Sequence, residues 1–378
     1  MMQRRVFLKL SVVFLVSIVL LSSAAPAFKA SETLPNRISD DVFWQMVSDF
    51  SEPDGFFRFE NFLSNELAFQ FVIPDLVEGA TPGGVYLGVG PEQNFTYLAA
   101  LQPEMAFIVD IRRQNMIEHM WYKALFELSA DRADFVSHLY ARKRPPGLND
   151  KSTARELFAA YRRLEADPAL AQKNISAIKD LLISRHKFGL SAEDQTTIEY
   201  VYKVFIDAGP ALDYSYGGGA PGGPQATPTY ADLMIATDEQ GQSRSYLATE
   251  ENYGIVREME RRNLIVPLVG DFAGPKTLLA IGQYIKDHDS KVTAFYTSNV
   301  EQYLFQQGND WRRFYSNVET LPTDSSSVFI RSVNGQNYPR LRGYRMRFQS
   351  VLSPISDLLK AFGEERIRYY SDIIRLSR

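Results

Sequence analysis

The chain has 378 residues, of which 45% are apolar and 23% are charged, so it holds enough apolar material for a substantial core. The net charge of −4 gives no overall basic field that would attract nucleic acid, and the absence of cysteine excludes disulfides, thiolate metal sites and a cysteine nucleophile. The four histidines lack the paired spacing of metal ligands, so we expect no metal.

The first thirty residues have the three-part pattern of an export signal: a basic start, the apolar run Leu10–Leu21 and small residues around Ala25–Ala27. Arg4–Lys9 also resembles the twin-arginine export motif, typically Arg-Arg-x-Phe-Leu-Lys. An uncleaved membrane anchor is a third interpretation, because Leu10–Ala27 is near the length that crosses about 30 Å of hydrocarbon. All three predict export to the periplasm, either free or anchored and facing it, with the export machinery as a partner.

Residues 31–80 are predicted to form a helical N-terminal extension. Ser39–Asp41 is a suitable cap for a helix through Val42–Phe50. Further along, the largely apolar stretch Glu66–Leu76 leads to a turn rich in glycine. Glu66 either lines a pocket or belongs to the first turn of a helix, and we favour the helix.

Short apolar runs predict the first two strands. Val85–Gly90 is a β-type run that ends in glycines, and Ala106–Asp110 is a buried strand that ends in an acid. Asn94–Leu101 between them is predicted to be a helix, and a long helix follows the second strand.

Residues 144–260 are predicted to be a helical insertion. Two motifs in it have the form of capping boxes, Thr153-x-x-Glu156 and Ser191-x-x-Asp194. The glycine- and proline-rich stretch 216–228 suits neither helix nor strand, and we expect a loop there.

The strand–helix pattern then resumes. Three more core strands are predicted, at Leu264–Val269, Val292–Tyr296 and Ser326–Ser332, with a helix over Thr277–Lys286. A closing helix is expected over Ser353–Leu376, with Ser353 as its cap and Pro354 at its first position.

Apolar strands that alternate with helices predict an α/β fold. The sheet should be doubly wound and mostly parallel, in a single domain over residues 31–378. Ligands of such sheets bind beyond the carboxyl ends of the strands. A glycine turn there allows close approach to the backbone, and an acid such as Asp110 suits a ribose diol. The unusual residues cluster at these strand ends: Gly88, Gly90, Asp110, Asp271 and Asn299.

These elements together resemble class I S-adenosylmethionine-dependent methyltransferases over about residues 60–335, apart from the insertion. Tyr86–Gly90 stands where that family has acid-x-Gly-x-Gly, and Phe107–Ile111 matches its second strand with the ribose-binding acid. Val269–Phe272 resembles its Gly-Asp element near the adenine, and Thr297–Val300 follows strand four, where the family places catalytic or substrate-facing groups.

The resemblance implies a Rossmann-like fold of the methyltransferase type with S-adenosylmethionine as cofactor. The implied cofactor-binding residues are Gly88, Gly90, Glu92, Asp110 and Asp271. Tyr86 replaces the family's first acid and Glu92 its third glycine, so Glu92 either binds the cofactor's ammonium group or excludes the ligand. No Asp/Asn-Pro-Pro-aromatic motif follows strand four, which argues against methylation of nucleobase or glutamine nitrogens.

Asn299 and Glu301 are the candidate catalytic residues. Glu301 is suitable as a general base if its surroundings raise its pKa. Ser298-x-x-Glu301 is also a capping box, and we favour that role for Glu301.

The leading functional hypothesis is an exported methyltransferase-like protein of unknown substrate. The alternative is a non-catalytic protein that binds a small ligand or a partner with the same fold. A nucleotide phosphate loop at Gly270–Thr277 is less favoured, because Pro275 has no amide hydrogen for phosphate. For a hydrolase, the sequence has no Gly-x-Ser-x-Gly motif, and only a mechanism based on carboxylates remains open.

Overall fold

The computed structural model describes residues 33–377 except 80–82, 215, 217–226 and 335–347. The predicted export segment 1–30 and most of the predicted loop 216–228 therefore lie outside the described residues. Within the described part, no helix combines the length and the apolar character needed to cross a membrane.

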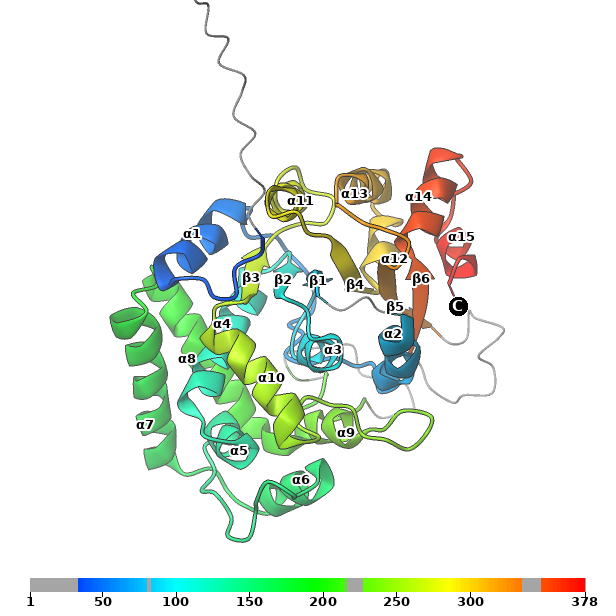
Figure 1. The fold of residues 1–378 in the computed structure, drawn as a ribbon. Coiled ribbons are helices and arrows are strands. Elements are labelled where there is room, and N and C mark those ends of the chain that lie inside the picture. Colours follow the sequence, from blue (N-terminus) through cyan, green and yellow to red (C-terminus); the bar gives the residue numbers. More distant parts are fainter. Residues whose placement is uncertain (1–32, 80–82, 215, 217–226, 335–347, 378) are drawn as a thin grey trace, which may run out of the picture. The chain divides into compact units, whose positions relative to one another are not determined.

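Six strands form one sheet among the described residues, in the order β3-β2-β1-β4-β5-β6 (Figure 1). The first five run parallel, and β6 runs antiparallel to β5. Since the chain moves outward from β1 to β3 and returns to β4, the strand order reverses between β1 and β4. The strands are β1 (Val85–Gly88), β2 (Met105–Asp110), β3 (Ile265–Val269), β4 (Val292–Ser298), β5 (Val328–Asn334) and β6 (Phe348–Pro354).

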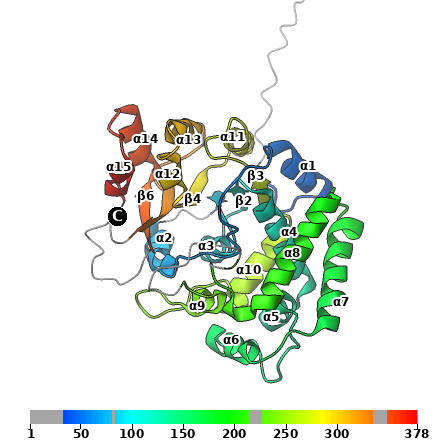
Figure 2. The same ribbon diagram turned by 180° about the vertical axis from the view of Figure 1, so that it is seen from behind.

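Helices cover both faces of this sheet (Figures 1 and 2). One face carries α1 (Asp40–Phe50), α11 (Thr277–Asp287), α13 (Asp310–Glu319) and α14 (Ile355–Gly363). The other carries α2 (Ile73–Gly79), α3 (Gln93–Leu101), α4 (Arg113–Leu128) and α10 (Glu250–Arg261). The predicted α/β class and mostly parallel sheet are confirmed, because continuously apolar strands need cover on both sides.

The remaining helices are α5 (Arg132–Tyr140), α6 (Ala154–Arg162), α7 (Pro168–Lys179), α8 (Ala192–Ala208), α9 (Tyr230–Ile235), α12 (Val300–Leu304) and α15 (Tyr370–Arg375), with short turns η1 (Phe69–Val72), η2 (Asp180–Arg185) and η3 (Gly209–Ala211). Helices α5, α7 and α8 pack on α4. The predicted cap of α1 is confirmed, since the Ser39 side chain accepts from the Val42 amide. Both predicted capping boxes, at the starts of α6 and α8, are confirmed as well.

The predicted helix over Ser353–Leu376 is wrong at its start. Ser353 and Pro354 belong to strand β6, and two shorter helices, α14 and α15, follow. Pro354 precedes α14 without any side-chain cap. Hydrogen bonding to the edge of β5 decides the conformation here, and a local serine–proline pattern does not reveal that partner.

The prediction that residues 31–80 are helical fails over residues 51–68, which form an irregular segment. Its backbone crosses the carboxyl ends of β3 and β2: the Glu52 amide donates to the Val269 carbonyl and the Gly55 amide to the Ile111 carbonyl, both at 2.8 Å. A Cβ at Gly55 would lie 2.4 Å from Ile111, so only glycine allows this approach. The segment thereby covers the edge where ligands of such sheets bind.

Candidate functional site

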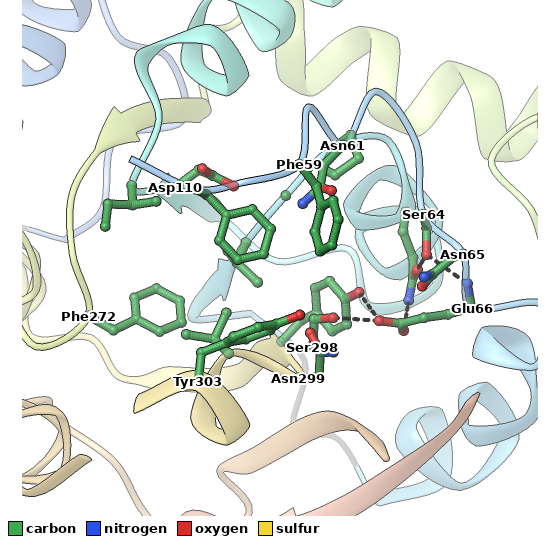
Figure 3. Close-up of a pocket in the computed structure, with 18 of the residues that line it drawn as sticks. Phe59, Asn61, Ser64, Asn65, Glu66, Asp110, Phe272, Ser298, Asn299 and Tyr303 are labelled. Carbon is green, nitrogen blue, oxygen red and sulfur yellow. Dashed lines mark hydrogen bonds between the residues drawn. The ribbon is translucent and has the colours of Figure 1, made fainter. Parts of the chain in front are cut away.

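A cavity of about 280 Å³ lies at the carboxyl ends of β1 to β4, beside the point where the strand order reverses (Figure 3). Four of its walls come from the strand ends, at residues 89–91, 109–111, 270–272 and 298–300. Residues within 56–66 of the irregular segment form another wall. Figure 3 shows Asp110 and Phe272 toward one end of the cavity and Ser64 and Glu66 toward the other.

Asp110 is the acid at the end of β2, and its side chain lines the cavity while remaining only 7% exposed. Its Oδ1 accepts from the Arg112 amide at 2.9 Å, and the Arg112 Nε lies 3.6 Å away. Burial raises the pKa of Asp110, and the positive charge of Arg112 opposes that effect. Both of these contacts are made by Oδ1.

The glycine turn after β1 is held together by Asn94. Its Nδ2 donates to the carbonyls of Val89, Gly90 and Pro91 at 3.0, 3.1 and 2.8 Å, and its Oδ1 accepts from the Tyr86 hydroxyl at 2.9 Å. A Cβ at Gly88 would lie 2.0 Å from Asn94 Oδ1. Gly88 is therefore required for packing against Asn94 and does not line the cavity, whereas Gly90, with φ of 74°, does.

Glu92 lies beneath the cavity wall and is fully buried. Its Oε1 accepts from the Ser64 amide at 3.3 Å, while Oε2 has no hydrogen-bond partner among the described residues. Burial raises the pKa of Glu92 to about 8. Neighbouring Glu118 is also fully buried, and burial together with the charge of Glu92 raises its pKa well above the usual value. With a pKa of about 8, Glu92 is mainly protonated at neutral pH.

Asp271 lines the cavity, and its Oδ1 accepts from the Ala273 amide at 2.8 Å. Asp271 belongs to the Gly270–Thr277 loop, whose sequence resembles a phosphate loop. Its amides at Asp271, Lys276 and Thr277 donate to the Glu52 carboxylate at 3.2, 2.9 and 2.9 Å. The donors that a phosphate would use are thus already bound to a side chain of the irregular segment.

Glu66 lines the other end of the cavity and is only 3% exposed. Its Oε1 accepts from the Ser298 hydroxyl at 2.5 Å and the Tyr296 hydroxyl at 3.0 Å, and its Oε2 accepts from Gln93 Nε2 at 2.9 Å. Burial raises the pKa of Glu66, and the hydrogen bonds from Ser298, Gln93 and Tyr296 oppose that effect. The favoured prediction that Glu66 starts a helix is wrong, because it lies in the irregular segment.

Asn299 lines the cavity next to Ser298 (Figure 3). Glu301 does not line it: its carboxylate pairs with the buried Arg331, with Oε2 at 2.5 Å from Nε and Oε1 at 3.2 Å from Nη2. The Tyr315 hydroxyl donates to Glu301 Oε1 at 2.8 Å. The predicted capping box is wrong, since α12 begins without a side-chain cap and Ser298 turns toward Glu66 instead.

Aromatic side chains of the irregular segment complete the cavity, and sequence reasoning missed them. The ring of Phe57 meets Tyr303 edge-on at 5.2 Å between centroids, and Phe59 lies 6.1 Å from Tyr214. Phe56 is 86% exposed at the rim. The run Phe56–Phe59 was the available signal, because three aromatic rings around one arginine are unusual outside a core or a binding site.

Among the described residues, no group of three or more histidine or acidic side chains has an arrangement that could hold a metal ion. The model of a family described as a domain of unknown function, DUF7790, matches residues 61–161 and 172–377, which is most of the chain. The matched part begins after the Phe56–Phe59 aromatics and includes every strand end around the cavity. No curated protein matches the sequence.

Proposed function

The chain belongs to the DUF7790 family, and from its cavity we propose that it binds S-adenosylmethionine and is methyltransferase-like. One observation carries the proposal: four residues expected at separate strand ends, Gly90, Asp110, Asp271 and Asn299, line a single cavity. The cavity lies where the strand order reverses, as the ligand sites of doubly wound sheets do. The sheet order and the helices on both faces support a Rossmann-like fold of the methyltransferase type.

The residues present fit this ligand. Asp110 would accept hydrogen bonds from the ribose hydroxyls, while Ile111 and Phe272 supply apolar surface for the adenine. A side chain added at Gly90 would meet nothing within 4 Å, so its backbone is open to the amino-acid end of the ligand. When bound, S-adenosylmethionine supplies an electrophilic methyl group, and an acceptor would lie near Asn299.

A non-catalytic binding protein is the second candidate, and the turn after β1 favours it. Tyr86 stands in place of the family's first acid, and its hydroxyl is engaged with Asn94. Glu92, in place of the third glycine, is buried and mainly protonated, so it offers the ligand's ammonium group no charge. Both candidates predict ligand binding, and only the first predicts methyl transfer.

Calorimetric titration of S-adenosylmethionine and S-adenosylhomocysteine into the purified chain tests the proposal. We expect micromolar binding that Asp110→Ala weakens by about 10- to 100-fold, because hydrogen bonds to a charged group contribute roughly 1.5–3 kcal/mol. Glu165→Ala is the matched control, since Glu165 is an exposed acid between α6 and α7. Absence of binding at millimolar ligand, in a folded sample, contradicts the proposal.

We also propose that residues 1–30 direct export. A reporter enzyme that is active only in the periplasm, fused after residue 30, should become active there. Replacing Arg4 and Arg5 together by lysine should abolish this activity if the twin-arginine route is used, and leave it intact for the general secretory route. Fusion protein that accumulates in the cytoplasm, with no reporter activity, contradicts export by either route.

A further inference from the structure

Ser298 occupies a sharp turn between a strand and a helix. Strand β4 ends at Ser298, which has φ of 49°, and α12 begins two residues later at Val300. A positive φ is uncommon for a residue with a side chain, and residues held this way gather at functional sites. The pairing of β4 with β5 also shifts register between Tyr296 and Ser298. The turn presents the Ser298 side chain to the cavity.

The Ser298–Glu66 pair joins the end of strand β4 to the irregular segment at the cavity. Ser298 does not cap α12, because its hydroxyl donates to Glu66 at 2.5 Å. Glu66 is surrounded by neutral donors, and no lysine, arginine or histidine of the described part lies within 4.0 Å of its carboxylate. A buried carboxylate without a counter-charge is costly to remove from water.

We propose that Ser298 and Glu66 form a nucleophile–base pair for acyl transfer, acting on esters with a small apolar or aromatic acyl group. The acyl group would lie against Phe57, Phe59 and Tyr303, which line the same cavity. The arrangement matches the physical requirements of an activated serine: a strained strand-to-helix turn, and a base within hydrogen-bond reach of the hydroxyl. The inference does not depend on the binding of S-adenosylmethionine.

The steps balance with water as the only co-reactant. Ser298 Oγ attacks the ester carbonyl carbon as its proton passes to Glu66. The tetrahedral intermediate then expels the alcohol, which takes that proton, and leaves an acyl-serine ester. Water, deprotonated by Glu66, attacks the acyl carbon, and Ser298 regains its proton as the carboxylic acid leaves. The Asn299 side chain, beside Ser298 at the cavity, is positioned to donate to the oxyanion.

A fluorophosphonate probe, which reacts with activated serines, tests the pair in the full chain. We expect covalent labelling of the peptide that contains Ser298, and hydrolysis of p-nitrophenyl butyrate, both abolished in Ser298→Ala. Glu66→Gln should lower both rates by about 100-fold or more, as loss of a general base does. Glu66→Asp retains a carboxylate and should recover part of the rate. Ser176→Ala, an exposed serine of α7, is the matched control.

No label on Ser298 and no hydrolysis by folded wild-type chain would overturn the proposal. So would hydrolysis that persists in Ser298→Ala, since the activity would then come from elsewhere. If Glu66→Gln does not fold, Ser298→Ala and Glu66→Asp still decide the question. Failure of the calorimetric titration would leave this result unaffected, so the two proposals are judged separately.

Discussion

At the scale of single residues, the main feature is how many ionisable groups are buried. Burial raises the pKa of both Glu92 and Glu118, and the charge of Glu92 raises the pKa of Glu118 further. Glu118 has no hydrogen-bond partner on either oxygen among the described residues. Glu301 and Arg331 solve the same problem differently, by neutralising each other at 1% exposure or less. The buried acids Glu92 and Glu118 make the free energy of unfolding depend on pH. The Glu301–Arg331 pair contributes to stability only while both side chains are present.

We expect the free energy of unfolding to fall as pH rises from about 5 to about 8. The unfolded chain releases the Glu92 proton near 4.5, whereas the folded chain holds it up to about 8. A pKa raised by folding stabilises the protein below the unfolded value, and that contribution is lost as pH rises, at about 1.4 kcal/mol per pH unit for each group. Urea unfolding of wild type and Glu92→Gln across this range measures the effect.

Glu92→Gln removes one such proton and should flatten the pH dependence, with the gain in stability greatest near pH 8. Glu165→Gln, an exposed acid, should leave the slope unchanged. Equal slopes for wild type and Glu92→Gln would contradict a raised pKa at Glu92.

Removing one member of the buried Glu301–Arg331 pair should destabilise the protein strongly. Glu301→Ala leaves the guanidinium buried without a partner, which costs about 3–5 kcal/mol. The double variant with Arg331→Met should recover part of this loss, because no unpaired charge remains. Chemical unfolding of both single variants and the double variant gives the coupling free energy. Independent, additive losses would show that the pair is not coupled.

At the scale of elements, the irregular segment 51–68 contributes more to the shape and lining of the cavity than any helix does. It covers the carboxyl ends of β2 and β3, and it supplies Glu52 to one loop and Glu66 to the cavity. Such a segment has no hydrophobic period, so its sequence does not reveal its path. Its conformation depends on partners more than fifty residues away, such as Ile111 and Val269.

Glu52→Gln tests how firmly this segment is attached. Glu52 accepts three amide hydrogen bonds, and removing its charge should lower the free energy of unfolding by about 1.5–3 kcal/mol. Asp49→Asn, at an exposed acid of α1, is the control. Urea unfolding provides the measurement. A loss no greater than that of the control would mean that the segment is held by other contacts.

At the scale of the whole molecule, the first three parallel strands could be predicted from sequence because each is an apolar run that leads directly to a glycine or an acid. The same logic located Gly90, Asp110, Asp271 and Asn299 around one cavity. Strand β6 could not be predicted, since the Ser353–Pro354 pair at its end resembles the start of a helix. The Glu66–Ser298 contact joins residues 232 positions apart, and no local pattern encodes such a contact.

Glu52 also has a consequence for how the chain responds to its medium. Because this carboxylate is attached to the same chain, its concentration at the Gly270–Thr277 loop is set by tethering, at an effective level of order millimolar or higher. Dissolved inorganic phosphate must compete with an anion that cannot diffuse away. The melting temperature should therefore be the same in phosphate buffer as in a buffer of equal ionic strength without phosphate. The amides of this loop thus take their anion from the chain itself and need no dissolved salt to bind one.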